Sequence, residues 1–454
     1  MSKNLMLTIC LGILLAPWLL SPVAADETLQ LRTVVTLPLL PNGSQSVLRS
    51  FDISFVNPRN HTYALAASAL SATGTGPASQ PGIVIIHTPS KQAKLLAVGQ
   101  FAGSCSIPPA PPVTYVGPNG VIVIEKGADA DIWAGDGAIF SPSCAPNANN
   151  TNVATYSNVK VLDLHTGAIK KVVSTGGVRR ADELCYNPLS DVVLVANSDP
   201  LDNFVTFIGD DDYQVLGKIK FDGNDPDGNN IQAKGIEHCQ FNPRDGKFYL
   251  NISATVTNGV AGPGMVLRIS AQAPFQVEAA FTIATATGCT GPQGMAIGPR
   301  HQIALGCGGT NSLIIDDRDG TTIATVAGEG GAGQAWYNPG SNHYYFARLG
   351  PGILGVEDAG PPPQADTPDT PTAGFSHSVA ADPHKNQVYV PIRTSTITQT
   401  ASVCGSKGGM DILGCIAIYD SPADTDDCIA DDDPVIGVND DGDEQFRRQR
   451  CIKN

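Results

Sequence analysis

Acidic, amide and histidine side chains recur at a fixed distance ahead of a proline that ends a short apolar segment. In "RRADELCYNP", two arginines and two carboxylates precede the apolar residues, namely Arg179, Arg180, Asp182 and Glu183. The residues six positions before such prolines include Asp52, Asp182, Glu237, Gln293 and His377, and the next position holds Glu183, His238 or Gln334 in three segments. If folding brings these positions together, they form one polar site from distant parts of the chain.

Carboxylates gathered in this way repel one another unless a positive charge lies among them. Asp52, Asp182 and Glu237 offer oxygen ligands that suit a hard ion such as Ca²⁺, whereas His377 and His238 would add nitrogen ligands that suit Zn²⁺. We therefore expect a divalent cation on the three carboxylates, Ca²⁺ in preference to Zn²⁺. In the alternative, basic residues neutralise the carboxylates, and the group only lines a channel and holds water.

The other polar residues have two expected roles. A polar ligand, either a small molecule or an oligomer, is expected to contact Arg179, Arg180, Lys234, Gln293 and Gln334. If the protein is an enzyme, the ion polarises a carbonyl group and His377, His238 or Glu183 acts as the general base. Three functions stay open: ligand binding without turnover, a metal-dependent hydrolase or lyase, and a protein-interaction scaffold.

Seven strand–turn–strand segments position these residues. Their turn prolines lie about 40 to 70 residues apart, the period of propeller blades with loop insertions, and are Pro58, Pro118, Pro188, Pro243, Pro299, Pro339 and Pro383. Further apolar runs follow most segments, which gives four strands per repeat. The pattern predicts an all-β, closed β-propeller of seven four-stranded blades, with residues 29–40 completing the last blade; six or eight blades stay open. In the second segment (111–127), Pro112 and Val113 take the positions at the channel mouth.

The segments "CYNPLSDVVLVANS", "VAADPHKNQVYVPI" and "VLDLHTGAIKKVV" resemble the blades of the YVTN/lactonase-like propeller superfamily. This resemblance covers nearly the whole mature chain and implies the propeller fold. In the more distantly similar gluconolactonase-like propellers, Asp, Asn and Glu side chains at the starts of inner strands hold a catalytic divalent ion. Asp182 and Glu237 match that location, whereas the Asn-Gly pair often found there is not matched by any inner-strand start identified in this sequence.

The chain ends and the cysteines define the compartment and the domains. Residues 1–25 read as a signal peptide cleaved after Ala25, which predicts a secreted or periplasmic protein without membrane insertion. Residues 26–422 form the single propeller domain, and 423–454 form an acidic tail. The ten cysteines after Cys10 are expected to form disulfides, with connectivity open and these pairs favoured: Cys185–Cys239, Cys289–Cys307, Cys404–Cys415, Cys105–Cys144 and Cys428–Cys451. The net charge of −15 argues against nucleic acid as a partner, and we expect a monomer.

Overall fold

The computed structural model describes residues 29–72, 80–103, 105–107, 113–115, 117–127, 129–137, 156–199, 202–224, 230–350, 352–371, 376–394, 403–405, 413–421, 436–438 and 444–446. The predicted signal peptide lies outside these residues, as does most of the acidic tail. The expected pairs Cys105–Cys144 and Cys428–Cys451 also lie wholly or partly outside them.

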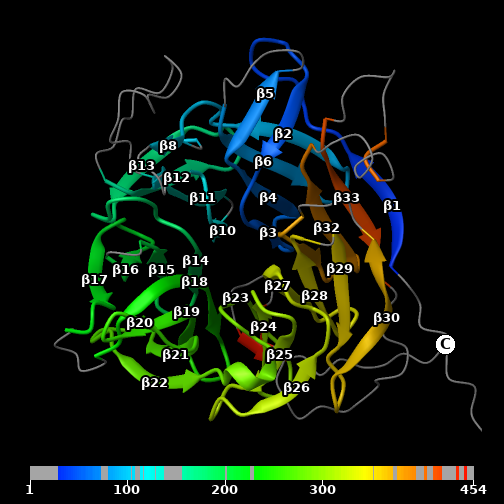
Figure 1. Cartoon of the computed structure of the whole chain (residues 1–454). Coiled ribbons are helices and arrows are strands. Elements are labelled where there is room, and N and C mark those ends of the chain that lie inside the picture. Colours follow the sequence, from blue (N-terminus) through cyan, green and yellow to red (C-terminus); the bar gives the residue numbers. More distant parts are fainter. Residues whose placement is uncertain are drawn as a thin grey trace, which may run out of the picture.

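Seven antiparallel four-stranded sheets surround a central axis as the blades of a propeller (Figure 1). Listed from the centre outward, blade 1 contains β3 (Ser54–Asn57), β4 (Thr62–Ala67), β6 (Gly82–His87) and β7 (Gln92–Leu96). Blade 2 contains β10 (Val121–Lys126), β11 (Asp129–Asp136), β12 (Asn158–Asp163) and β13 (Ile169–Ser174). Blade 3 contains β14 (Leu184–Asn187), β15 (Val192–Asn197), β16 (Phe204–Gly209) and β17 (Val215–Lys220).

The remaining blades follow the same plan. Blade 4 contains β18 (Ala233–Asn242), β19 (Lys247–Thr257), β21 (Met265–Ser270) and β22 (Val277–Thr282), and a short strand β20 (Val260–Ala261) pairs with β19. Blade 5 contains β23 (Pro292–Ile297), β24 (Gln302–Cys307), β25 (Ser312–Asp316) and β26 (Thr322–Val326). Blade 6 contains β27 (Ala332–Asn338), β28 (His343–Arg348), β29 (Ile353–Asp358) and β30 (Gln364–Pro371).

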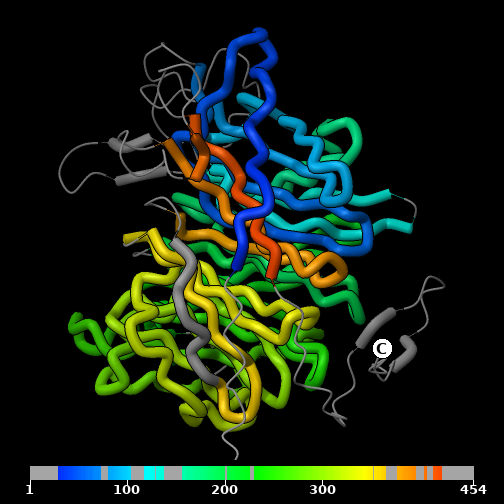
Figure 2. Tube along the Cα trace, turned by 90° about the vertical axis from the view of Figure 1, so that its right-hand side faces the viewer, coloured from blue at the N-terminus to red at the C-terminus, as the bar shows by residue number. Residues whose placement is uncertain are grey.

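The ring closes in blade 7, where the N-terminal strand pairs with C-terminal strands. The order is β31 (Ala380–Asp382), β32 (Gln387–Ile392), β33 (Cys415–Asp420) and β1 (Gln30–Val35). Figure 2 shows β1, in blue, running beside β33, in orange to red. The predicted closure is confirmed, and it leaves no open edge between the first and last parts of the ring. Across the adjoining seam the rings of Tyr63 and Tyr389 stack with centroids 5.1 Å apart.

One turn type joins the first two strands in five blades and explains the repeated Asx-Pro sequence. The Asn or Asp at the end of the inner strand accepts a hydrogen bond from the backbone N–H two residues later, and the following proline fixes φ. The accepting residues are Asn57, Asn187, Asn242, Asn338 and Asp382, with N···O distances of 2.9 to 3.1 Å. The last turn residue is left-handed in each case, with φ from 48 to 68°: His61, Asp191, Gly246, Asn342 and Asn386.

We expect Asn187→Ala to lower the free energy of unfolding by about 1–3 kcal/mol, because its buried amide also donates to Ser190 Oγ at 2.5 Å and to the Ala271 carbonyl at 3.3 Å. Urea denaturation measures the change. Asn42→Ala is the matched control, since Asn42 accepts from Ser44 N–H at 3.0 Å in an exposed loop, and we expect a loss below about 0.5 kcal/mol. Equal losses in the two variants would contradict this account of the turn.

Two sequence expectations are wrong. Residues 113–115 do not form the inner strand of blade 2: β9 (Val113–Tyr115) pairs with β8 (Cys105–Ile107), and β10 is the inner strand. Pro118 therefore precedes the inner strand instead of forming the turn after it. In the tail, where no strand was expected, β34 (Ile436–Val438) pairs with β35 (Glu444–Phe446).

The two ends of the channel are built differently. At the end where the inner strands finish, four-residue Asx-Pro turns join the first two strands of five blades. At the end where they begin, which we call the mouth, blades 1 and 4 carry extra strands. There β5 (Ala69–Ala72) continues from β4 and pairs with β2 (Ser46–Ser50), and β20 extends β19. Variation at one end of a regular scaffold is typical of a functional face.

Candidate functional site

The polar residues ahead of the inner strands share one level of the ring because the strands are bulged there. In blade 3, Asp182 N–H donates to the Ala196 carbonyl at 2.7 Å, and Ala196 N–H donates to the Glu183 carbonyl at 2.9 Å. Two residues thus oppose one, which is a β-bulge. Blades 1 and 2 repeat both hydrogen bonds, and the register of β18, β23 and β27 shifts at the same place.

We call the first residue of each pair the rim and the following residue the second level. The rim consists of Asp52, Asn119, Asp182, Glu237, Gln293, Gly333 and His377. The second level consists of Ile53, Gly120, Glu183, His238, Gly294, Gln334 and Ser378. The sequence placed these positions in every blade except blade 2, where Asn119 and Gly120 take the places expected of Pro112 and Val113. An Asn-Gly pair therefore does stand at an inner-strand start, contrary to expectation.

Arg180 is the positive charge among the acidic residues of these two levels. Its Nη2 lies 2.7 Å from Asp182 Oδ2, and the two side chains are 31% and 3% exposed. Burial lowers the pKa of the Arg180 guanidinium, but the charges of Asp182, Asp52, Glu237 and Glu183 outweigh it and leave the pKa above its usual value. Four carboxyl groups from three blades therefore act electrostatically on one guanidinium, and Asp182 contacts it directly.

Burial and mutual repulsion raise the pKa values of three of these carboxyl groups. Burial is the main cause at Asp182, where Arg180 opposes it and Asp52 and Glu237 add to it, and the pKa rises to about 8. The same causes raise the pKa of Glu183 well above its usual value, and burial also raises that of Glu237. Glu183 is 7% exposed, and in the described part of the chain its Oε2 has no hydrogen-bond partner. When ionised, the four carboxyl groups carry more negative charge than the single positive charge of Arg180 neutralises.

His377 lies beside Asp52 on the blade 7 side of the rim. Its Nε2 is 3.7 Å from Asp52 Oδ1, too far for a hydrogen bond, and its ring meets Phe51 edge-on at 5.2 Å. The side chains of His377 and Asp52 are 27% and 22% exposed, so solvent reaches this part of the mouth. Burial lowers the pKa of His377 and the Asp52 charge partly restores it. The imidazole is a neutral base without a hydrogen-bond partner for Nε2 among the described residues.

His238 is held in one tautomer. Its Nδ1 accepts a hydrogen bond from the Met295 N–H of the next blade at 3.1 Å, so the ring proton of the neutral form is on Nε2. Burial lowers the pKa of His238 to about 4. The imidazole is therefore neutral at physiological pH and its basic nitrogen is already used, which disfavours His238 as a general base.

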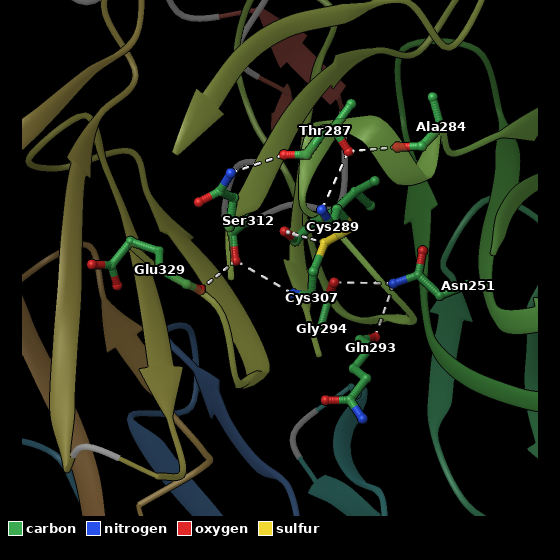
Figure 3. The surroundings of a disulfide bond; sticks show 11 residues. Asn251, Ala284, Thr287, Cys289, Gln293, Gly294, Cys307, Ser312 and Glu329 are labelled. Carbon is green, nitrogen blue, oxygen red and sulfur yellow. Dashed lines mark hydrogen bonds between the residues drawn. A yellow bond between two sulfur atoms is a disulfide. The ribbon is translucent and has the colours of Figure 1, made fainter. Parts of the chain in front are cut away.

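The expected ligand-binding residues occupy different surroundings. Arg179 Nε lies 3.4 Å from Asp199 Oδ2 and thus turns away from Asp182, whereas Arg180 turns toward it. Lys234 is exposed and Gln293 half-buried. The Gln293 and Gly294 carbonyls accept hydrogen bonds from Asn251 Nδ2 at 2.9 and 3.0 Å, which join blades 4 and 5 (Figure 3).

Gln334 is fully buried and links three blades. Its Nε2 donates to the Ser54 carbonyl of blade 1 at 2.9 Å, and its Oε1 accepts from Ser378 Oγ at 2.6 Å and from Val379 N–H at 3.0 Å in blade 7. The Gln334 side chain therefore links blade 6 to blade 7 and also to blade 1, on the other side of blade 7. Sequence reasoning placed Ser378 at the second level but gave it no role, and it missed Ser54.

Three disulfides are present among the described residues, in the expected pairs: Cys185–Cys239, Cys289–Cys307 and Cys404–Cys415. Their number indicates an oxidising, extracytoplasmic environment. Cys289–Cys307 lies at the mouth of blade 5, beside Gln293 and Gly294 (Figure 3). Cys185–Cys239 joins the inner strands of blades 3 and 4, two residues after Glu183 and one residue after His238.

We expect Cys185→Ala/Cys239→Ala to destabilise the protein more than Cys404→Ala/Cys415→Ala. The sequence separations are 54 and 11 residues, and chain-entropy arguments give about 4 kcal/mol for the longer loop and about 3 kcal/mol for the shorter. Denaturant unfolding of the two double variants measures the difference. A Cys185/Cys239 variant as stable as the wild type would show that this bond does not hold the two blades together.

Comparison with known proteins supports the fold alone. No family model matches the sequence, and no curated protein matches it significantly. A solved structure described as the mitotic checkpoint complex contains a chain similar to this one, with a TM-score of 0.55 and 12% identity over 92% of this chain and 99% of that chain. Hydrazine synthase from Kuenenia stuttgartiensis is similar with a TM-score of 0.54 and 14% identity over 76% of this chain and 92% of that chain.

No group of three or more His, Cys, Asp or Glu side chains in the described ranges is placed to hold a metal ion. None of the helices in the described ranges is long and apolar enough to span a membrane.

Proposed function

We propose that this protein is an exported β-propeller, secreted or periplasmic, that binds a polar, positively charged ligand at the mouth of its central channel. The observation that carries the proposal is the buried Glu183 Oε2 without a hydrogen-bond partner among the described residues. It lies in the field of Asp182, Asp52 and Glu237, with Arg180 opposing them. A ligand cation would supply the positive charge that this group lacks.

A divalent cation is one ligand of this kind. Asp52, Asp182 and Glu237 supply oxygen donors, which favour Ca²⁺ over Zn²⁺. Asp182 is already paired with Arg180 at 2.7 Å, so an ion on Asp182 would have to compete with the guanidinium. The donor types suit Ca²⁺, but these carboxylates are not placed together as a metal site in the described part of the chain. The present arrangement favours a cation that adds to Arg180 over one that replaces it.

The test is calorimetric titration of chelator-treated mature protein at pH 8 with CaCl₂, ZnCl₂ and methylammonium chloride. We expect binding of a cation, with Asp182→Asn and Glu237→Gln each weakening it by about 1–3 kcal/mol, because each removes one partner of a charged contact. Asp211→Asn, which removes an 82% exposed carboxylate, is the charge-matched control and should leave affinity unchanged. Absence of binding by all three probes would overturn the proposal, and tighter binding of Zn²⁺ than Ca²⁺ would overturn the metal preference.

A metal-dependent hydrolase or lyase, as the lactonase-like resemblance implies, is the second candidate. The raised pKa of Glu183 favours it, because burial and the neighbouring carboxyl groups make Glu183 hold its proton to higher pH than an ordinary glutamate, and a held proton can be donated to a leaving group. This makes Glu183 an acid instead of the base expected from the sequence. Assay of a panel of lactones with wild type and Glu183→Gln tests this role. Turnover that Glu183→Gln abolishes supports it, and absence of turnover leaves ligand binding as the function.

A further inference from the structure

We propose that the ligand of this site is an organic cation, an ammonium group attached to an apolar or aromatic body. This inference rests on the proposed function and adds the chemistry of the ligand's uncharged part. The cation contacts the carboxyl groups of Asp52, Asp182, Glu183 and Glu237, and the apolar body lies against Trp336 and Phe55.

Three residues beyond the rim, the inner strands carry mostly apolar side chains in place of acidic ones. The residues three positions after each rim residue are Phe55, Ile122, Cys185, Gln240, Ala296, Trp336 and Ala380. Gln240 is the one amide at this level, and both its ends are bonded to β23, with Nε2 donating to the Met295 carbonyl at 3.0 Å and Oε1 accepting from Ile297 N–H at 2.8 Å. Three residues of strand span about 10 Å, so the apolar level lies within reach of a small aralkyl amine held at the rim.

Phe55 and Trp336 are in contact although they lie in different, non-adjacent blades. Their ring centroids are 5.7 Å apart in an edge-to-face arrangement, although blade 7 stands between blade 1, which carries Phe55, and blade 6, which carries Trp336. The contact is possible because the intervening position in blade 7 is the small Ala380. Both rings are only half-buried, whereas the other tryptophan of the described residues, Trp133, is fully buried.

The two levels are complementary to one kind of ligand. The acidic level favours positive charge, and the half-buried rings of Trp336 and Phe55 favour apolar carbon or the positive edge of an aromatic ring. A bare metal ion would use only the first level, and an uncharged aromatic compound only the second. An amine on an aromatic body uses both, and Glu183 stands between the rim and the apolar level, at the position such an amine would reach.

Three matched probes test the inference at pH 8: 2-phenylethylammonium chloride, methylammonium chloride and 2-phenylethanol. The reporter is a Trp133→Phe variant, whose fluorescence after signal-peptide removal comes from Trp336. We expect 2-phenylethylammonium to bind at least tenfold more tightly than methylammonium and to change the Trp336 emission. We expect 2-phenylethanol to bind at least tenfold more weakly than 2-phenylethylammonium.

In the wild-type background, calorimetry of Trp336→Leu should lose the tenfold advantage of 2-phenylethylammonium while methylammonium affinity is kept. Trp336→Phe, which keeps an aromatic face, should retain most of it, and this variant guards against misfolding of Trp336→Leu. Equal affinity for the two ammonium ions in wild type would overturn this inference and leave the proposed function standing. Absence of binding by both ammonium ions and by CaCl₂ would overturn both.

Discussion

Removal of residues 26–35, which include β1, is expected to destabilise the propeller by on the order of 5 kcal/mol, because five residue pairs between β1 and β33 are lost at about 1 kcal/mol each. The deletion also exposes the edge of β33, which favours aggregation. Circular dichroism melting of the truncated and intact mature proteins measures the change. We expect the whole ring to unfold in one transition at lower temperature.

A synthetic peptide of residues 26–40 supplies the matched control. Added to the truncated protein, it should pair with β33 and raise the melting temperature, since strand addition to an open edge restores main-chain hydrogen bonds. A peptide of the same composition in scrambled order should not. A truncated protein that melts like the intact one would show that β1 does not close the ring.

Arg180→Gln should have the second large effect, a loss of about 3–5 kcal/mol at pH 8, because it leaves buried carboxylates without their positive partner. At pH 5 the loss should be smaller, since Asp182, Glu183 and Glu237 bind protons and the repulsion falls. Denaturant unfolding at the two pH values measures both. Arg179→Gln is the matched control: its partner contact is 3.4 Å with Asp199, and we expect a loss below about 1 kcal/mol at either pH.

The wild-type protein should itself lose stability as the pH rises. The pKa of Asp182 is about 8 in the folded protein, above the usual value of 3.8. The folded state therefore binds an extra proton between these values, and the stabilisation is complete below about pH 4 and is lost as the pH rises through 8. Asp182→Asn should flatten this dependence. Stability that is independent of pH from 5 to 8.5 in the wild type would contradict the protonated state of the group.

The fold could be predicted because its turns have a local physical cause. The Asx-Pro turn with a left-handed last residue is visible in the sequence around Asn57, Asn187 and Asp382, and it sets the register of the inner strand in five blades. Blade 2 was misassigned because its inner hairpin lacks this turn. Pro118 was taken for the turn proline, but it lies before β10.

The site was predictable in position but not in contacts. A fixed distance from the turn brings Asp52, Asp182 and Glu237 to one level, and that distance can be counted in the sequence. The sequence does not show which neighbouring side chain contacts the site, because that depends on the folded surroundings. Arg180 contacts Asp182, whereas Arg179 contacts Asp199.

The contacts between blade 6 and blade 1 could not be predicted from the sequence for the same reason. Gln334 reaches Ser54, and Trp336 reaches Phe55, only because ring closure sets blade 6 near blade 1 and blade 7 offers small residues between them.

We propose that the mouth holds buried, partly protonated carboxyl groups whose negative charge a bound cation would neutralise. Calorimetric titration of the mature protein at pH 7.5, in two buffers of different ionisation enthalpy, measures the protons released on binding 2-phenylethylammonium or CaCl₂. We predict release of on the order of one proton per bound cation, since the pKa of Asp182 is about 8 in the free protein, and a smaller release in Asp182→Asn. Binding without proton release, or no binding of either cation, would contradict the account.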